Sequence, residues 1–145
     1  TPKAMLPRHH GHEQRSIELL AEFGERLRVP NRYLSLAYSV AKFHGQAHRV
    51  DELTPKKLLR LLTEIGALRN PNVLEDFIAA CEADARGRTG LEDRPYRQAE
   101  RLRTAHAAAT SIGSDHVTDS SLRGAAFGQA LEKLRITAIK QALAA

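Results

Sequence analysis

Apolar residues recur every three or four positions along most of the chain, and no stretch shows the strict alternation of a half-buried β-strand. This spacing predicts helices over residues 13–28, 30–45, 71–85, 95–111 and 122–143, and one more that begins at Pro55. Pro30, Pro55 and Pro71 stand at predicted helix starts, where the missing N–H of proline is not needed. The sequence therefore predicts an all-α fold.

One acidic residue falls on the apolar stripe of the helix predicted over 71–85. That stripe contains Phe77 and Cys81, and Asp84 follows three residues later, hence on the same face. A carboxylate that points inward needs a counter-charge, a hydrogen-bond donor or a metal ion. Arg86 and Arg88 offer the simpler explanation, an internal salt bridge with Asp84.

Histidines gather in the first third of the chain. His9, His10 and His12 precede the first predicted helix, where they could bind a metal ion or a phosphate, or lie in a solvated loop. His44 extends the stripe of Leu36 and Val40. It shares one helix face with His48 if the second helix continues past Gly45.

Two interpretations of these histidines remain open. A partly buried imidazole is often satisfied by a hydrogen bond alone. Alternatively, histidines combined with Asp84 suit a divalent metal ion that activates water against a phosphate ester. Arg86 and Arg88 would then hold phosphate oxygens.

Composition narrows the classes of protein. The 145 residues carry a net charge of +5, which suits a polyanionic partner such as nucleic acid. Cys81 is the single cysteine, so no internal disulfide can form, and a reducing cytoplasm is expected. No stretch reaches the roughly 20 apolar residues of a membrane span. The arginines of the segment 94–103 form either a solvated face or a surface for a nucleic-acid backbone.

Several blocks resemble, in order, the bacterial CCA-adding enzymes of the multifunctional type, which carry an HD domain. They are Thr1-Pro2, Pro7-Arg8-His9-His10-Gly11-His12, Leu27-Arg28-Val29-Pro30-Asn31, Phe43-His44, and Glu82-Ala83-Asp84-Ala85-Arg86-Gly87-Arg88-Thr89-Gly90. The resemblance runs from Thr1 to about Tyr96 and continues more weakly to the end. It implies an enzyme that adds C, C and A to tRNA 3′ ends from CTP and ATP, through a nucleotidyltransferase head that uses Mg²⁺.

The resemblance also implies where this chain lies in such an enzyme. Residues 1–68 would be the C-terminal part of the HD phosphohydrolase domain, and 69–145 a helical body and tail that contacts tRNA. The head and the His-Asp dyad would precede Thr1, so the isolated chain is expected to be an inactive C-terminal fragment. The HD region of the family is a phosphatase, 2′-nucleotidase and 2′,3′-cyclic phosphodiesterase that uses Ni²⁺ or another transition metal.

The resemblance assigns roles to seven positions, with one departure. His12, His44 and Asp84 would be metal ligands, and His44 and Asp84 would also be catalytic. Phosphate or RNA contacts would come from Arg8, His10, Arg86 and Arg88. The family pattern Phe-His-Asp is Phe43-His44-Gly45 here, so one carboxylate is missing. The alternative is therefore a non-catalytic module for tRNA binding or homodimerisation with a degenerate HD site.

The same resemblance makes a prediction about the surface. If helices that normally precede Thr1 are absent, the first two helices should expose an apolar face. We expect that face to be covered by another chain or by rearrangement.

Overall fold

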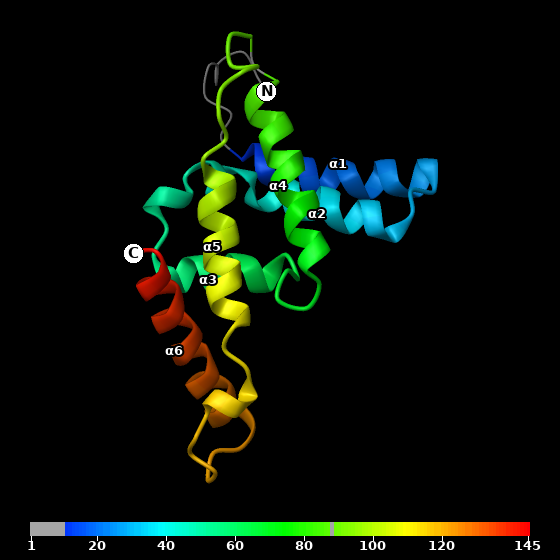
Figure 1. The fold of residues 1–145 in the computed structure, drawn as a ribbon. Helices are drawn as coiled ribbons and strands as arrows, with labels where there is room; N and C mark the ends of the chain where they lie inside the picture. The colour runs from blue at the N-terminus through cyan, green and yellow to red at the C-terminus, as the bar shows by residue number, and fades with distance from the viewer. Residues whose placement is uncertain (1–10, 88) are drawn as a thin grey trace.

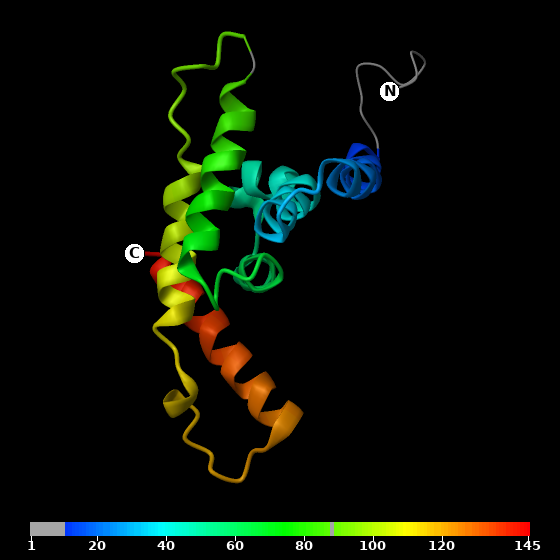
Figure 2. The same ribbon diagram turned by 90° about the vertical axis from the view of Figure 1, so that its right-hand side faces the viewer.

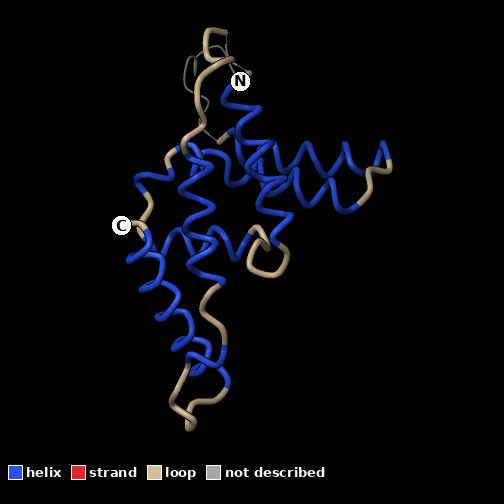
Figure 3. The backbone as a smooth tube through the Cα atoms, viewed as in Figure 1, coloured by secondary structure: helices blue, strands red, loops and turns tan. Residues whose placement is uncertain are grey.

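The computed structural model describes residues 11–87 and 89–145. For His12, within the first range, it describes the backbone alone. This part of the chain forms six α-helices and two 3₁₀ turns without any β-strand, as Figure 3 shows. The predicted all-α class is therefore confirmed. The elements are α1 (His12–Leu27), α2 (Asn31–His48), η2 (Val50–Glu52), α3 (Pro55–Glu64), α4 (Pro71–Arg86), α5 (Gln98–Thr110), η3 (Ser114–His116) and α6 (Gly124–Ala142).

Side-chain caps fix two of the predicted helix starts. The hydroxyl of Thr54 accepts a hydrogen bond from the backbone N–H of Lys57 at 3.4 Å, directly before Pro55. The side chain of Asn70 accepts from the N–H of Asn72 at 3.1 Å, directly before Pro71. Each cap satisfies one of the donors that a helix start leaves without a partner.

Two predicted boundaries were wrong. The second helix does not end at Gly45 but continues to His48, because Phe43 and Ala47 are buried and their packing outweighs the low helix propensity of glycine. The fifth helix begins at Gln98 rather than at residue 95. The carbonyl of Tyr96 accepts the N–H of Ala99 at 3.2 Å at this helix start.

The core lies where the end of α2 meets α3, α4 and α5. Phe43 and Phe77 are buried there. α6 adds Ile139, which is fully buried. The other members are Ala47, Val50, Leu58, Leu59, Leu61, Leu62, Ile65, Ala67, Leu74, Ile78, Cys81, Ala99, Leu102, Ala105 and Ala109.

Figure 1 shows α1 and α2 side by side, projecting from the rest of the bundle. In the view of Figure 2, α4 and α5 lie alongside each other, and α6 runs obliquely below them. The α1–α2 hairpin closes tightly at Gly24, where an added Cβ would lie 2.6 Å from a methyl carbon of Leu34. None of the described helices is long and apolar enough to cross a lipid bilayer.

The expected apolar face is present on the α1–α2 hairpin. Phe23, Leu27 and Tyr33 are each about half exposed, and Leu19 is 59% exposed. These side chains continue the apolar periodicity of α1 and α2, but no described element covers them. Exposure of this face is therefore confirmed, and what covers it remains a prediction.

Candidate functional site

An apolar groove runs along the α1–α2 hairpin and ends against α4. Its volume is about 930 Å³, and most of its lining is aliphatic or aromatic. Only a few polar side chains reach it, and two of these are the predicted ligands His44 and Asp84. The remaining lining residues are Ser16, Leu19, Leu20, Glu22, Phe23, Arg26, Tyr33, Leu36, Ala37, Val40, Ala41 and Ala80. An apolar hollow with a few convergent polar groups is the usual form of a ligand site.

His44 is oriented by its own helix. Its Nδ1 lies 2.9 Å from the carbonyl oxygen of Val40, one turn earlier in α2. Because a carbonyl only accepts, Nδ1 carries the proton, and in the neutral ring the lone pair is then on Nε2. A backbone carbonyl on the distal nitrogen is the arrangement commonly found around metal-binding histidines.

His48 connects three parts of the fold. Its Nε2 lies 2.8 Å from Oδ2 of Asp84 in α4, and its Nδ1 lies 3.2 Å from the hydroxyl of Tyr96, just before α5. The His48 ring also meets the ring of His44 edge to face, with 5.8 Å between centroids. The continuation of α2 past Gly45 thus places both histidines beside Asp84.

The prediction that Asp84 points into the core was wrong. Its side chain is 47% exposed and lies at the rim of the groove. The simpler explanation, a salt bridge between Asp84 and Arg86, does not hold, because Arg86 pairs with Glu82 at 2.8 Å and donates to the carbonyl of Arg94 at 3.2 Å. After Cys81, α4 extends beyond the packed core, so Asp84, three residues later on the same face, is exposed to solvent.

The buried thiol of Cys81 and the partly buried phenol of Tyr96, both close to Asp84, stay protonated. Burial raises the pKa of the Cys81 thiol to about 12, and the nearby charge of Asp84 adds to that effect. Burial likewise raises the pKa of the Tyr96 phenol, with further contributions from Cys81, Glu82 and Asp84. Tyr96 therefore remains a neutral phenol that can donate to His48. Cys81 is not a reactive thiol.

Whether a metal ion fits depends on the ligands that meet here. An imidazole and a carboxylate at one groove are suitable in kind for a transition metal. Within the described residues, no three His, Cys, Asp or Glu side chains are close enough together to hold an ion. His44 and Asp84 can thus supply two ligands, and further ligands would have to come from elsewhere.

Arg8, His10, Arg88 and the side chain of His12 lie outside the described residues. Sequence reasoning in turn missed Tyr96 as a partner of His48. The only available signal was an aromatic residue with a polar tip close after the Glu82–Gly90 block, and it does not specify a partner 48 residues away.

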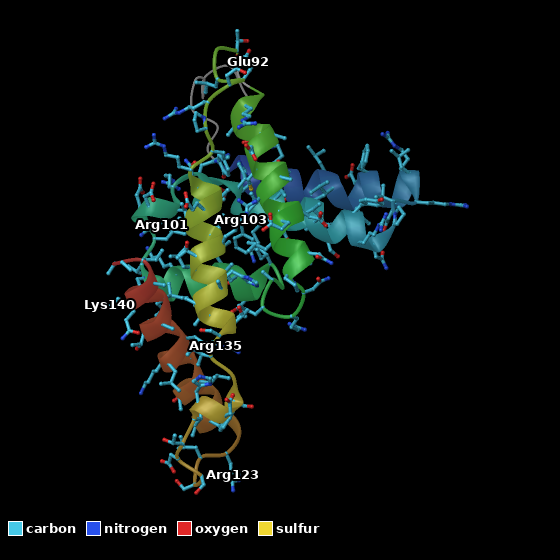
Figure 4. The ribbon with its side chains drawn as sticks, in the orientation of Figure 1. Glu92, Arg101, Arg103, Arg123, Arg135 and Lys140 are labelled. Carbon is cyan, nitrogen blue, oxygen red and sulfur yellow. The ribbon has the colours of Figure 1, made fainter. Side chains whose placement is uncertain are left out.

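The arginines near α5 divide into two groups. Arg103 forms a bidentate pair with Glu75, with contacts of 2.9 Å and 2.6 Å, and Arg101 lies 3.5 Å from Asp51. In the described part of the chain, Arg94 and Arg97 form no ion pair. Figure 4 shows further cations: Arg123 directly before α6, and Arg135 and Lys140 within it.

Comparisons with known proteins give a consistent result. The chain is 49% identical over 141 residues to the multifunctional CCA protein of Thioalkalivibrio sulfidiphilus, covering 97% of this chain and 34% of that protein. It is 46% identical over 143 residues to the protein of the same name from Nitrosococcus oceani, covering 99% and 35%. The multifunctional CCA protein of Methylococcus capsulatus is 46% identical over 146 residues, covering 100% of this chain and 34% of its own length.

Two further comparisons found nothing. No family model matches the chain, and no solved structure matches it. The chain spans 34% to 35% of the length of the relatives named above. The resemblance predicted from the motif blocks is confirmed: over nearly its whole length, this chain is similar to part of the multifunctional CCA proteins.

Proposed function

We propose that the protein containing this sequence is a CCA-adding tRNA nucleotidyltransferase, and that these residues supply a metal-dependent phosphohydrolase site and contacts to tRNA. CTP and ATP would be used by a nucleotidyltransferase head with Mg²⁺ that lies outside the 145 residues, and the protein would work in the cytoplasm. The phosphohydrolase would act as a phosphatase, 2′-nucleotidase and 2′,3′-cyclic phosphodiesterase. The isolated 145 residues would be inactive.

One observation carries the hydrolase part of this proposal. His44 from α2 and Asp84 from α4 line the same groove, although 40 positions separate them in the sequence. Both are positions that the family resemblance selects. Their surroundings also suit ligation, because the Val40 carbonyl fixes the tautomer of His44 and His48 bonds the carboxylate of Asp84.

A divalent metal such as Ni²⁺, when bound, would activate water and polarise a phosphate ester. His44 Nε2 and a carboxylate oxygen of Asp84 would hold it, together with His12 and ligands from outside these residues. Arg8, His10, Arg86 and Arg88 would hold phosphate or RNA oxygens.

The test uses the full-length gene product with His44→Ala and Asp84→Asn. We expect Ni²⁺ affinity and phosphatase activity to fall in both variants by more than the roughly 10–100-fold that is typical when a residue hydrogen-bonded to a metal ligand is replaced. CCA addition by the head should continue. Ni²⁺ content is measured by elemental analysis, and hydrolysis by release of phosphate from 2′-AMP.

A matched control exists within the chain. His116 and Asp115 form an exposed pair on η3, with 3.3 Å between Nδ1 and Oδ1. Variants His116→Ala and Asp115→Asn remove the same chemical groups away from the groove and should leave both readouts unchanged. Unchanged nickel content and hydrolysis in the His44 and Asp84 variants would refute the hydrolase assignment.

A second candidate function is a non-catalytic module for tRNA binding or homodimerisation. Gly45 favours it, because glycine supplies no carboxylate and the described residues lack a three-ligand set. In this case tRNA binding should still depend on salt, whereas metal should have no effect. Filter binding of tRNA over a salt series tests the tRNA contact, because released counterions make the affinity fall as salt rises. A flat response would exclude it.

A further inference from the structure

A chain of hydrogen bonds outside the predicted ligand set ends on Asp84. It runs from the Tyr96 hydroxyl to Nδ1 of His48 at 3.2 Å, and from Nε2 of His48 to Oδ2 of Asp84 at 2.8 Å. The three residues come from three segments: the end of α2, the last turns of α4, and the turn before α5. Neither His48 nor Tyr96 lines the groove itself.

The donor and acceptor roles along this chain follow from chemistry. A carboxylate oxygen only accepts, so Nε2 of His48 carries a proton and donates it to Asp84. In the neutral ring Nδ1 is then an acceptor, and the phenol of Tyr96 donates to it. The Tyr96 phenol is suited to this because it stays protonated.

His48 is well anchored for this role. Its side chain is only 23% exposed, and its backbone carbonyl accepts a hydrogen bond from the side-chain amide of Gln98 at 3.2 Å. The ring of Tyr96 packs edge to face on the imidazole, with 5.9 Å between centroids. Asp84, in contrast, is about half exposed, and a carboxylate in that position would otherwise sample several rotamers.

No other cation competes for Asp84 among the described residues. Arg86, the nearest basic residue along α4, is held by Glu82 and by the Arg94 carbonyl. The hydrogen bond that fixes the carboxylate is therefore the one from His48. The second oxygen, Oδ1, is not used in this bond.

We propose that His48 and Tyr96 are positioning residues of the candidate site, which hold the carboxylate of Asp84 at the groove ready to bind a divalent metal ion. This role rests on the proposed hydrolase function. It separates the two histidines of α2: His44 binds the ion directly, and His48 acts through Asp84. Tyr96 acts one step further away, through the tautomer and orientation of His48.

The test compares His48→Leu, His48→Gln and Tyr96→Phe in the full-length protein, with Ni²⁺ as the probe. Leucine removes the hydrogen bond to Asp84, whereas the glutamine amide can restore a donor near the position of Nε2. We expect about a tenfold weaker Ni²⁺ affinity in His48→Leu, recovery of most of the loss in His48→Gln, and a smaller weakening in Tyr96→Phe. Tyr38→Phe, elsewhere on α2, is the matched control.

A second readout needs neither metal nor activity. In the metal-free protein, nitrogen NMR of His48 should show the Nε2–H tautomer, and Tyr96→Phe should shift the Nδ1 resonance through loss of its donor. Melting temperatures distinguish a positioning role from a purely structural one. If His48 only supported the fold, His48→Leu and His48→Gln would lower the melting temperature equally, and the glutamine variant would not recover Ni²⁺ affinity.

The outcomes distinguish this inference from the function on which it rests. Loss of Ni²⁺ binding in Asp84→Asn with unchanged affinity in His48→Leu would overturn the positioning role and keep the site. An Nδ1–H tautomer of His48 in the metal-free protein would overturn it as well. Unchanged Ni²⁺ binding in Asp84→Asn would overturn the hydrolase function, and the positioning role with it.

Discussion

The central bundle and the α1–α2 hairpin use apolar residues in opposite ways. In the bundle, Phe77, Leu58 and Leu62 are completely buried, and every described helix from α3 to α6 contributes at least one buried side chain. In the hairpin, Gly24 is the only buried residue among those of α1 whose burial the structure describes, and Phe23, Leu27 and Leu19 are about half exposed. The two regions share the end of α2, where Phe43 and Ala47 enter the core.

This difference separates stability from recognition. Burial of apolar area drives folding, so the bundle supplies most of the free energy of unfolding. An exposed apolar face contributes little to that energy and is typical of an interaction surface. The candidate site lies where the hairpin meets the bundle: His44 and His48 are in the last turns of α2, and Asp84 is in α4 of the bundle.

The largest effect is expected on the free energy of unfolding when one phenylalanine from each region is replaced by alanine. Phe77→Ala removes a fully buried ring from α4 and should lower the free energy of unfolding by about 3–5 kcal/mol. Phe23→Ala removes a ring that is 46% exposed, and its effect should be well below half of that. Urea denaturation followed by circular dichroism measures both. Equal losses would contradict the division into two regions.

The next prediction concerns binding by the hairpin face. Replacing both Phe23 and Leu27 by serine should strongly reduce fluorescence of a hydrophobic dye on the 145-residue chain, while the melting temperature changes little. Light scattering on the same samples shows whether a second copy covers the face. If the unsubstituted chain binds no dye and stays monomeric, the face is not accessible and the prediction is wrong.

Periodicity predicted the bundle well for a physical reason. Buried stripes in α3 and α4 repeat at helical spacing, and Thr54 and Asn70 mark the starts by capping that depends only on neighbouring residues. Such local signals can be read from a single sequence. The start of α5 was misplaced because Pro95 and the arginines near it are compatible with either conformation.

The site was only partly predictable, because its contacts are long-range. Sequence spacing identified His44 and Asp84, but treated Asp84 as a continuation of the buried stripe. Whether that stripe is still covered depends on where α2 crosses α4, which no local pattern contains. The pairing of His48 with Asp84 and Tyr96 depends on the same crossing, so it became visible only in the fold.

A smaller effect is expected from a cap within the bundle. Thr54→Ala removes the acceptor for the N–H of Lys57 and should lower the free energy of unfolding by about 1 kcal/mol. Thr54→Ser keeps the oxygen and should stay close to the parent protein. A loss in the serine variant as large as in the alanine variant would show that the methyl group, not the cap, matters.

The smallest effect comes from the ion pair that joins α4 to α5. The guanidinium of Arg103 holds the pKa of Glu75 below its usual 4.5, so the folded chain binds a proton there less readily than the unfolded chain. The resulting stabilisation is present above about pH 4.5 and is lost as the pH falls through the lowered pKa. Both side chains are about half exposed, which limits this stabilisation to at most about 1 kcal/mol.

Arg103→Gln should flatten the decline of the melting temperature between neutral pH and pH 3 and remove part of its salt dependence, whereas Arg97→Gln should do neither. A decline of equal steepness in both variants would show that other carboxylates, and not this link between α4 and α5, determine the acid sensitivity of the bundle.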